Sequence, residues 1–434
     1  MKGKKEFMPA FPVLVNLEEL VPSTHLLRRL NDLLDFAFIG PMTDLLYCQT
    51  NGRPSIDPEV FFRMTLVSYL YGLPSDRVLC AELQFNLAYR WFCRFTLSDS
   101  IPDHSSMTRI RDRLGERIFN DIFNQILELC RAKKLLKNKG EVLFDSSHIQ
   151  ADACVDSIVK RTKETATGVN RRKGSKLKSE TYRSTTDEDA AMSGKKGVPR
   201  GLYYKVHTAV DAESIIILEP HVTTASVHDG KALLPQIDSL KLNRNFEVES
   251  VVADRAYGFG ENLQELKNRD IEAFVGTFHR DVAAKVENLN YEPVEDKLQC
   301  QGGHWLFGKK SEAEKNTTYY TFKEKPCKGC EHRESCPLIK NLRHEKYFRI
   351  SSFHQVMSKA AALEKTDVFI KKLGQRMWKS EGLFAEAKEN HCLRRARYRG
   401  RAKVQIQAYM IAIVQNLKRL LSQASRSPPT PILV

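Results

Sequence analysis

Apolar residues at helical spacing dominate the first third of the chain. Between residues 16 and 138 they recur three or four positions apart, as they do on the buried face of an amphipathic helix. Asp57-Pro58 is a typical helix start, with an N-cap followed by proline, and Ile101-Pro102-Asp103 marks another. We therefore expect residues 1–138 to form an all-helical N-terminal domain.

Beyond residue 138 the pattern changes to short apolar runs separated by helical stretches. In chain order, the predicted elements are a strand at 142–144, an antiparallel hairpin at 203–210 and 215–222, a helix near 230–242, a strand at 249–254, a helix at 261–269 and a strand at 273–275. This order predicts a mixed α/β sheet with crossover helices in residues 139–280.

The last part of the chain returns to helical spacing after an interruption at residues 281–369. A long helix at 358–391 and a strongly amphipathic helix at 406–421 are expected to complete the α/β core within residues 370–424. The tail at 425–434 is rich in proline, which favours disorder.

The chain is strongly basic, with a formal net charge of +15. Residues 160–200 supply nearly half of this excess, because they hold 12 Lys or Arg against 5 Asp or Glu. A segment with so few large apolar residues cannot order itself alone, so it is either a mobile arm that follows phosphates or a solvated loop. The overall charge favours a nucleic acid as partner, the alternative being that it serves solubility alone.

Composition also indicates where the protein resides. The ten cysteines accompany no apolar signal segment, so we expect free thiols and a cytoplasmic location. No apolar run reaches the roughly 18 residues of a membrane-spanning helix, so no membrane partner is expected.

Four cysteines in the 281–369 interruption have the spacing of metal ligands. Cys327 and Cys330 form a Cys-x2-Cys pair, Cys336 follows after five residues, and Cys300 is a further thiol. This pattern is typical of a structural zinc or iron–sulfur knuckle, in which His304 or His332 could replace one thiolate. The alternative is a loop with reduced thiols and no metal.

Three acidic residues are candidate ligands of divalent cations. Asp145 and Asp254 each end an apolar strand, and ligands gather at the carboxyl ends of such strands. Glu381 shares a partly apolar helical face with three later residues at i+3, i+4 and i+7, namely Phe384, Ala385 and Lys388. That face is expected to point inward. Three converging carboxylates can hold two Mg²⁺ ions, which clamp the oxygens of a displacement at phosphorus.

Two arginine clusters are candidate DNA contacts. Arg109 and Arg111 lie near a helix start, where they could place a recognition helix on DNA, or they could be solvated residues of a plain helical bundle. Arg394, Arg395 and Arg397 belong to a run that also contains an aromatic residue. This combination suits a phosphate backbone and an unstacked base.

Several blocks together resemble a known family. The blocks Asp145-Ser146-Ser147-His148-Ile149-Gln150-Ala151, Asp254-Arg255-Ala256-Tyr257 and Glu381-x2-Phe384-x3-Lys388 resemble those of the DDE transposases of bacterial insertion sequences. Residues 53–58 and 102–106 resemble the helical N-terminal domain of one large subgroup. Some members of that subgroup carry a cysteine-bearing insertion like 300–336. The resemblance covers roughly residues 20–420.

The resemblance implies an RNase H-like catalytic core that cuts DNA and transfers the freed 3′-hydroxyl end to a target. Asp145, Asp254 and Glu381 would hold two Mg²⁺ ions, for which Mn²⁺ could substitute. The protein would pair two transposon ends, which implies a homodimer on DNA.

Further residues acquire expected roles from the same resemblance. Tyr257, Arg376 and Lys388 are candidate contacts with transposon-end DNA, and His148 would orient DNA or a metal, unless it only bonds a neighbouring strand. The chain departs from related families at Arg376, which precedes the block's glutamate by five residues instead of four. Met377 stands at the usual position.

Two other functions share parts of this pattern. A DNA-binding protein descended from a transposase would recognise transposon ends without catalysis, and a nuclease would cut without rejoining. The presence of all three acidic residues favours the enzyme over the binding protein, because binding alone has no chemical need of them.

Overall fold

The structure is a computed structural model that describes residues 16–424 except 49, 53–54, 161–181, 194–196, 278–289, 293, 296, 313–316, 323–325 and 337–347. The chain forms two compact units. The helical unit comprises Met1–Ile126, Glu389–Cys392 and Tyr409–Val434, and the sheet unit comprises Leu127–Lys388 and Leu393–Ala408. The predicted tail at 425–434 and most of the predicted basic arm lie outside the described residues.

The end of the chain packs with the N-terminal helices, which corrects the expected division at residue 138 and the assignment of all of 370–424 to the α/β core. The Tyr409 ring lies 5.6 Å from that of Phe123. The Arg29 guanidinium donates to the Leu421 carbonyl over 2.9 Å. The last helix is therefore divided: its residues up to Ala408 belong to the sheet unit, and its residues from Tyr409 belong to the helical unit.

The helical unit is built from short helices. They are α1 (Leu17–Leu20), α2 (Leu26–Leu33), α3 (Ile39–Thr43), α4 (Pro58–Leu70), α5 (Asp76–Phe85) and α6 (Leu87–Phe92), together with parts of the long helices α7 (His104–Ala132) and α14 (Arg401–Ala424). Helix α4 begins as predicted, because the Asp57 carboxylate accepts the Glu59 N–H and Pro58 occupies the first turn. In α7, Gly115 adopts φ 66° and interrupts the helical backbone.

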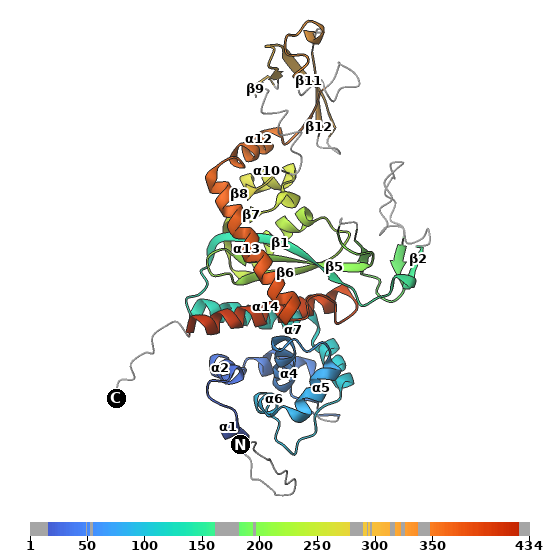
Figure 1. The fold of residues 1–434 in the computed structure, drawn as a ribbon, viewed down its shortest axis with the longest axis vertical. Helices are drawn as coiled ribbons and strands as arrows, with labels where there is room; N and C mark the ends of the chain where they lie inside the picture. Colours follow the sequence, from blue (N-terminus) through green and yellow to red (C-terminus); the bar gives the residue numbers. More distant parts are fainter. Residues whose placement is uncertain are drawn as a thin grey trace, which may run out of the picture. The chain divides into compact units, whose positions relative to one another are not determined.

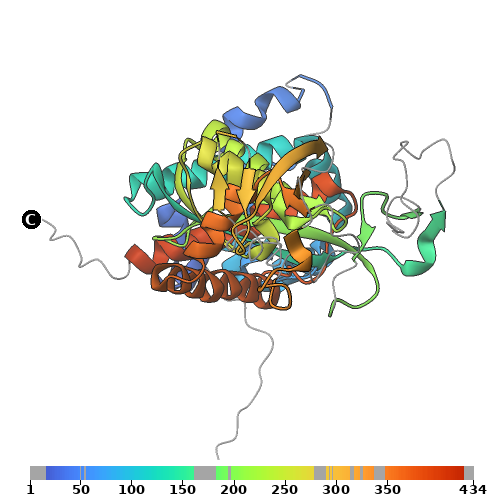
Figure 2. The ribbon, with the colours of Figure 1, turned by 90° about the horizontal axis from the view of Figure 1, so that it is seen from above.

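The main sheet of the sheet unit has six strands. Figure 1 labels several of them, and Figure 2 shows the same ribbon from above. They are β1 (Lys139–Gln150), β4 (Ala191–Met192), β5 (Leu202–Asp211), β6 (Ile217–Thr224), β7 (Glu247–Ala253) and β8 (Glu272–Val275), with helices α9 (Leu233–Arg244) and α10 (Gly260–Asn268) between the later ones. Strand β1 pairs antiparallel with β5 and parallel with β7, and β7 pairs parallel with β8. The spatial order β6–β5–β1–β7–β8 is that of an RNase H-like fold, as expected.

The strand that carries Asp145 is longer than predicted. Its parallel pairing with β7 ends at Phe144, opposite Ala253, but its antiparallel pairing with β5 continues to Gln150. Every residue of β5 is buried, so β1 has a fully packed neighbour along its second half. The apolar run Val142–Phe144 marks only the stretch in which β1 is flanked on both sides.

Residues 290–351 form a second, antiparallel sheet. Its strands are β9 (Asn290–Glu292), β10 (Lys297–Gln299), β11 (Trp305–Glu312), β12 (Thr317–Phe322) and β13 (Phe348–Ser351), in the order β13–β12–β11–β10–β9. The helix predicted at 358–391 is instead two helices, α12 (His354–Leu363) and α13 (Asp367–Asn390). The second begins where it does because the Thr366 hydroxyl accepts the Phe369 N–H. Among the described residues, the helices include none long and apolar enough to cross a membrane.

Candidate active site

The register of the main sheet brings Asp145 and Asp254 side by side. Phe144 and Ala253 are the last parallel pair of β1 and β7, and each is followed directly by an aspartate. Backbones of neighbouring strands lie about 4.8 Å apart, so the two aspartate side chains start from adjacent positions on neighbouring chain segments. The Asp145 carboxylate accepts the Ser146 N–H over 2.8 Å, and that of Asp254 accepts the Ala256 N–H over 2.8 Å. Local backbone donors thus hold both side chains in place.

A single guanidinium bridges the two aspartates. Arg376 Nη2 lies 2.6 Å from Asp145 Oδ1 and 3.9 Å from Asp254 Oδ2. Its Nε donates to the Phe144 carbonyl over 3.1 Å. The arginine is 7% exposed, so its charge acts where solvent screens it little. Arg376 is therefore the counter-ion of this carboxylate pair, a role different from the DNA contact that the resemblance implied.

The same helix turns Glu381 away from the pair. On α13 the cations Lys372, Arg376 and Lys379 lie at i, i+4 and i+7 and face the sheet. Lys372 pairs with Glu141, and Lys379 Nζ donates to the Ala212 carbonyl over 2.5 Å. Each helical residue advances about 100°, so a separation of five residues places Glu381 about 140° around the helix from Arg376. Glu381 is exposed, and the prediction that it faces inward is wrong.

The expected three-carboxylate set is consequently incomplete. Within the part of the chain that the structure describes, no group of three or more His, Cys, Asp or Glu side chains is placed to hold a metal ion. Asp145 and Asp254 provide oxygen donors of the kind that Mg²⁺ prefers, but the guanidinium bridges them and the third donor lies elsewhere. The arrangement does not fit a metal held by all three predicted residues.

A buried ion pair next to Asp145 has no counterpart in the sequence predictions. Lys205 of β5 donates from Nζ to Asp229 Oδ1 over 2.9 Å and to the Val227 carbonyl over 2.7 Å, and the two charged side chains are 10% and 15% exposed. A lysine in the middle of the apolar strand 203–210 is the signal that could have found it, because a charge there must be paired.

Burial and charge alter the pKa values of the groups around this ion pair. Burial alone would raise the pKa of Asp229, but hydrogen bonds and charge from Lys205, with a further hydrogen bond from Ser146, bring it below its usual value. Burial lowers the pKa of His207 to about 3, so that imidazole is neutral near pH 7. Burial, followed by the charges of Asp229 and the two site aspartates, raises the pKa of Tyr257 well above its usual value.

Two residues that were predicted to contact DNA, Tyr257 and Arg111, are buried, so neither prediction agrees with the structure. Tyr257 is 1% exposed, so its ring packs inside the sheet unit and cannot reach DNA. Arg111 is 2% exposed and pairs with Asp76 Oδ2 over 2.6 Å inside the helical unit. By contrast Arg109 is exposed, and Lys388 is half-buried. His148 bonds Ser193 over 3.1 Å, which agrees with the alternative that it only holds a neighbouring segment.

The predicted arginine run forms a loop fastened to the end of β1. The Ala396 N–H donates to the Gln150 carbonyl over 2.7 Å, and the Gln150 N–H donates to the Arg394 carbonyl over 3.1 Å. Arg397 is half-buried, whereas Arg394 and Arg395 are exposed. The loop is therefore hydrogen-bonded to the last residue of β1, the strand that carries Asp145.

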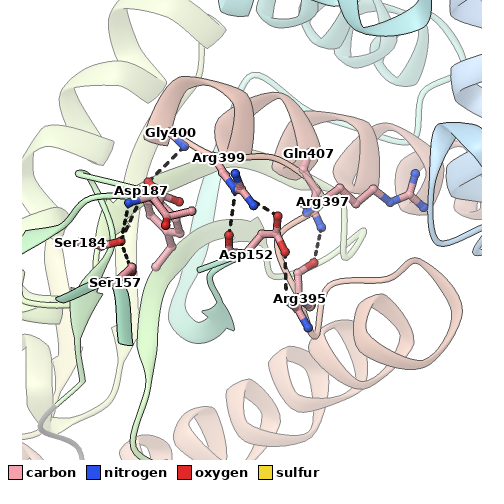
Figure 3. A network of polar contacts seen from close by, with 11 residues as sticks. Asp152, Ser157, Ser184, Asp187, Arg395, Arg397, Arg399, Gly400 and Gln407 are labelled. Atoms are coloured by element: carbon pink, nitrogen blue, oxygen red, sulfur yellow. Dashed lines mark hydrogen bonds and ion pairs between the residues drawn. The ribbon is translucent and has the colours of Figure 1, made fainter. Parts of the chain in front are cut away.

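Figure 3 shows how acidic side chains hold the arginine loop. Arg395 Nη2 lies 2.9 Å from Asp152 Oδ1 and Arg399 Nε lies 3.2 Å from Asp152 Oδ2, so two guanidinium groups share one carboxylate. The Gly400 N–H donates to Asp187 Oδ1 over 3.2 Å. Both arginine side chains are more than half exposed, and ion pairs that are this exposed contribute little free energy. A phosphate can therefore compete for these guanidinium groups.

The predicted zinc ligands are only partly gathered. Cys300, Cys327, Cys330 and Cys336 are all half-buried, and none of the four forms a disulfide. A Cβ on Gly302 would lie 3.8 Å from the Cys300 sulfur and 3.1 Å from that of Cys330, so these two thiols flank the same glycine. Within the described residues the four thiols do not form a metal-holding group, which corrects the zinc assignment for this arrangement.

Three family models of transposase domains match the chain. The family model described as Transposase domain (DUF772) matches residues 15–113, and two models described as Transposase DDE domain match residues 151–282 and 299–421. No curated protein matches the chain. Among solved structures, the piggyBac transposase synaptic complex with hairpin DNA is similar over 91% of this chain and 79% of that chain, with 9% identity and a TM-score of 0.32.

The sheet order and the paired aspartates at its centre define a protein with an RNase H-like core, and most of the helical unit precedes that core along the chain. The matches place transposase domains over both parts. The chain belongs to the DDE transposases of insertion elements.

Proposed function

We propose that this transposase cleaves DNA at the ends of its own insertion element and joins the freed 3′-hydroxyl ends to target DNA in a Mg²⁺-dependent reaction. The observation that carries the proposal is the register-adjacent pair Asp145 and Asp254 at the centre of an RNase H-like sheet. Two carboxylates lie side by side there, each accepting a backbone N–H, and Asp254 in this way caps the turn Arg255–Tyr257. Their mutual repulsion must be offset by a cation, which here is Arg376.

The residues around the two aspartates are consistent with cleavage of a phosphodiester bond. Mg²⁺, when bound, would supply positive charge for the displacement at phosphorus. Ser146 and Ala256 hold the two carboxylates through their backbone N–H groups. We keep Glu381 as the proposed third acid. Because it lies on the exposed face of α13, its participation requires the helix to turn about its axis when DNA and metal bind.

Exposed arginines supply the proposed DNA contacts. Arg394 and Arg395 lie on the loop that is hydrogen-bonded to Gln150 at the end of β1, and Arg109 is exposed on the helical unit. We propose that these side chains bind phosphates of the transposon end. Two ends must be brought together for transposition, so we also propose that the protein acts as a homodimer on DNA.

The test is cleavage and joining of DNA that carries the element's own ends, with Mg²⁺ or Mn²⁺. Asp254→Asn should abolish cleavage and retain DNA binding, since it removes one charge and keeps the side chain's size. The matched control is Asp238→Asn on α9, whose carboxylate pairs with Arg269 at the surface, and it should cleave like the wild type.

The other outcomes separate the competing functions. Binding of both wild type and variant without cleavage would favour a transposase-derived DNA-binding protein. Cleavage without joining would favour a nuclease. Equal cleavage by wild type and Asp254→Asn would show that the proposed carboxylate pair is not the site.

A further inference from the structure

The ion pair Lys205–Asp229 lies beneath the candidate site and is linked to both of its aspartates. Asp229 begins the short helical turn Asp229–Ala232, and the Ser146 side chain lies close enough to its carboxylate to lower the pKa of that carboxylate. Ser146 in turn donates its backbone N–H to Asp145 Oδ1. One hydroxyl-bearing residue therefore connects the buried pair to the first catalytic candidate.

The same turn is packed against the segment that follows Asp254. The Asn262 side chain donates to the Gly230 carbonyl over 2.8 Å and to the Tyr257 carbonyl over 2.9 Å, so it joins the two turns. A Cβ on Gly230 would lie 2.8 Å from the Ala256 carbonyl oxygen and 2.5 Å from the Phe259 ring. Only glycine permits this approach. A shift of Asp229 would therefore be transmitted to the loop that holds the second aspartate.

A buried hydroxyl also lies among these acids. The Tyr257 side chain is 1% exposed, and its hydroxyl has no hydrogen-bond partner among the described residues. It is close enough to Asp229, Asp145 and Asp254 for all three charges to act on it. The buried carboxylate and the two site aspartates therefore all lie near the same ring.

We propose that Asp229 and Lys205 are positioning residues of the active site. Asp229 orients Asp145 through Ser146, and its turn sets the spacing to Asp254 through Gly230 and Asn262. Lys205 pairs with the Asp229 carboxylate and so offsets the free-energy cost of burying its charge, which holds the carboxylate in place. This inference rests on the proposed function, because the aspartates it positions are those assigned there.

A second buried ion pair of the same unit provides a matched comparison. Arg244 Nε lies 2.6 Å from Glu219 Oε2, and the two side chains are 1% and 6% exposed. Glu219 also accepts from the Ser239 hydroxyl over 3.2 Å. Glu219 lies on β6 and Arg244 ends α9, whereas Asp145 lies on β1 and Asp254 follows β7. Breaking either pair should destabilise the fold, because it leaves a buried charge alone, but only one pair should affect cleavage.

The experiment compares single and double variants of the two pairs. Asp229→Asn and Lys205→Met should each lower the melting temperature, and the double variant should regain most of the loss because no unpaired charge remains. Cleavage of the element's ends should stay reduced by about 100-fold in the double variant, the size of effect that follows from misplacing a reacting group by about 1 Å. The double variant Glu219→Gln with Arg244→Met should regain stability and cleave normally.

Ser146→Ala tests the connection itself. It should reduce cleavage with little change in melting temperature, and adding it to Asp229→Asn should cause no further loss. If the Asp229–Lys205 double variant recovers cleavage together with stability, the pair is merely structural and the proposal is overturned. A wild type that does not cleave, or an Asp145→Asn variant that does, would instead refute the proposed function, so the two failures are distinguishable.

Discussion

Arg376→Met removes the charge that the structure places between the two aspartates and retains most of the side chain's length. In the wild type the guanidinium pairs with Asp145, whose side chain is 18% exposed, and donates to a buried carbonyl. A hydrogen bond to a charged group contributes about 1.5–3 kcal/mol. The second pair contributes less, since Asp254 is 46% exposed and its distance is 3.9 Å. We expect a net loss of about 2–3 kcal/mol without metal ions.

The assay is thermal unfolding with and without Mg²⁺. For a domain of this size the loss corresponds to a melting temperature lower by roughly 4–10 °C. The variant should be stabilised by Mg²⁺ more than the wild type is, because a cation that binds near the two aspartates no longer competes with the arginine. Lys372→Met is the control, since it breaks the pair with Glu141 on the same helix but leaves the aspartates untouched.

Two results would refute this reasoning. An Arg376→Met protein as stable as the wild type in the absence of metal would show that the guanidinium is not the needed counter-ion. Equal Mg²⁺ stabilisation of wild type, Arg376→Met and Lys372→Met would show that Arg376 and metal do not share the carboxylates.

Burial and charge also predict how four single substitutions should behave. Glu381→Gln should leave the melting temperature within about 1 °C of the wild type, since exposed substitutions change stability little, while cleavage assays report whether the residue acts in the DNA complex. Arg111→Met should lower the melting temperature without changing the salt dependence of DNA binding, whereas Arg395→Ala should reduce the slope of log affinity against log salt by about 1. His207 has a folded pKa of about 3, against about 6.5 in the unfolded chain, because it is buried. Its contribution to stability is therefore complete above pH 6.5 and lost as the pH falls toward 3, so His207→Gln should flatten the melting temperature profile between pH 6.5 and 5.

The sheet and its aspartates could be predicted because they depend on local patterns. An apolar run that ends in aspartate marks both Asp145 and Asp254, and parallel strands end at the same edge of a sheet. The ion pair of Lys205 and Asp229 could not be predicted from sequence, because its members are 24 positions apart and meet only in the folded chain. The packing of Tyr409 with Phe123 is likewise a contact between distant segments.

Helix α13 shows why the orientation of Glu381 could not be predicted from the sequence pattern. The face containing Glu381 and Phe384 includes one strongly apolar residue, but the helix is anchored through Lys372, Arg376 and Lys379, whose polar ends all find partners on the sheet. The buried side of α13 also includes Phe369, Leu383 and Ala387, so apolar burial and the ion pairs select the same side of the helix, and Glu381 lies off it. The five-residue spacing between Arg376 and Glu381 then fixes the phase: a helix that presents the arginine to the aspartates presents the glutamate to solvent. The two side chains cannot face the aspartates at the same time. In the proposed mechanism α13 must turn for Glu381 to reach the aspartates, and Arg376 then leaves them.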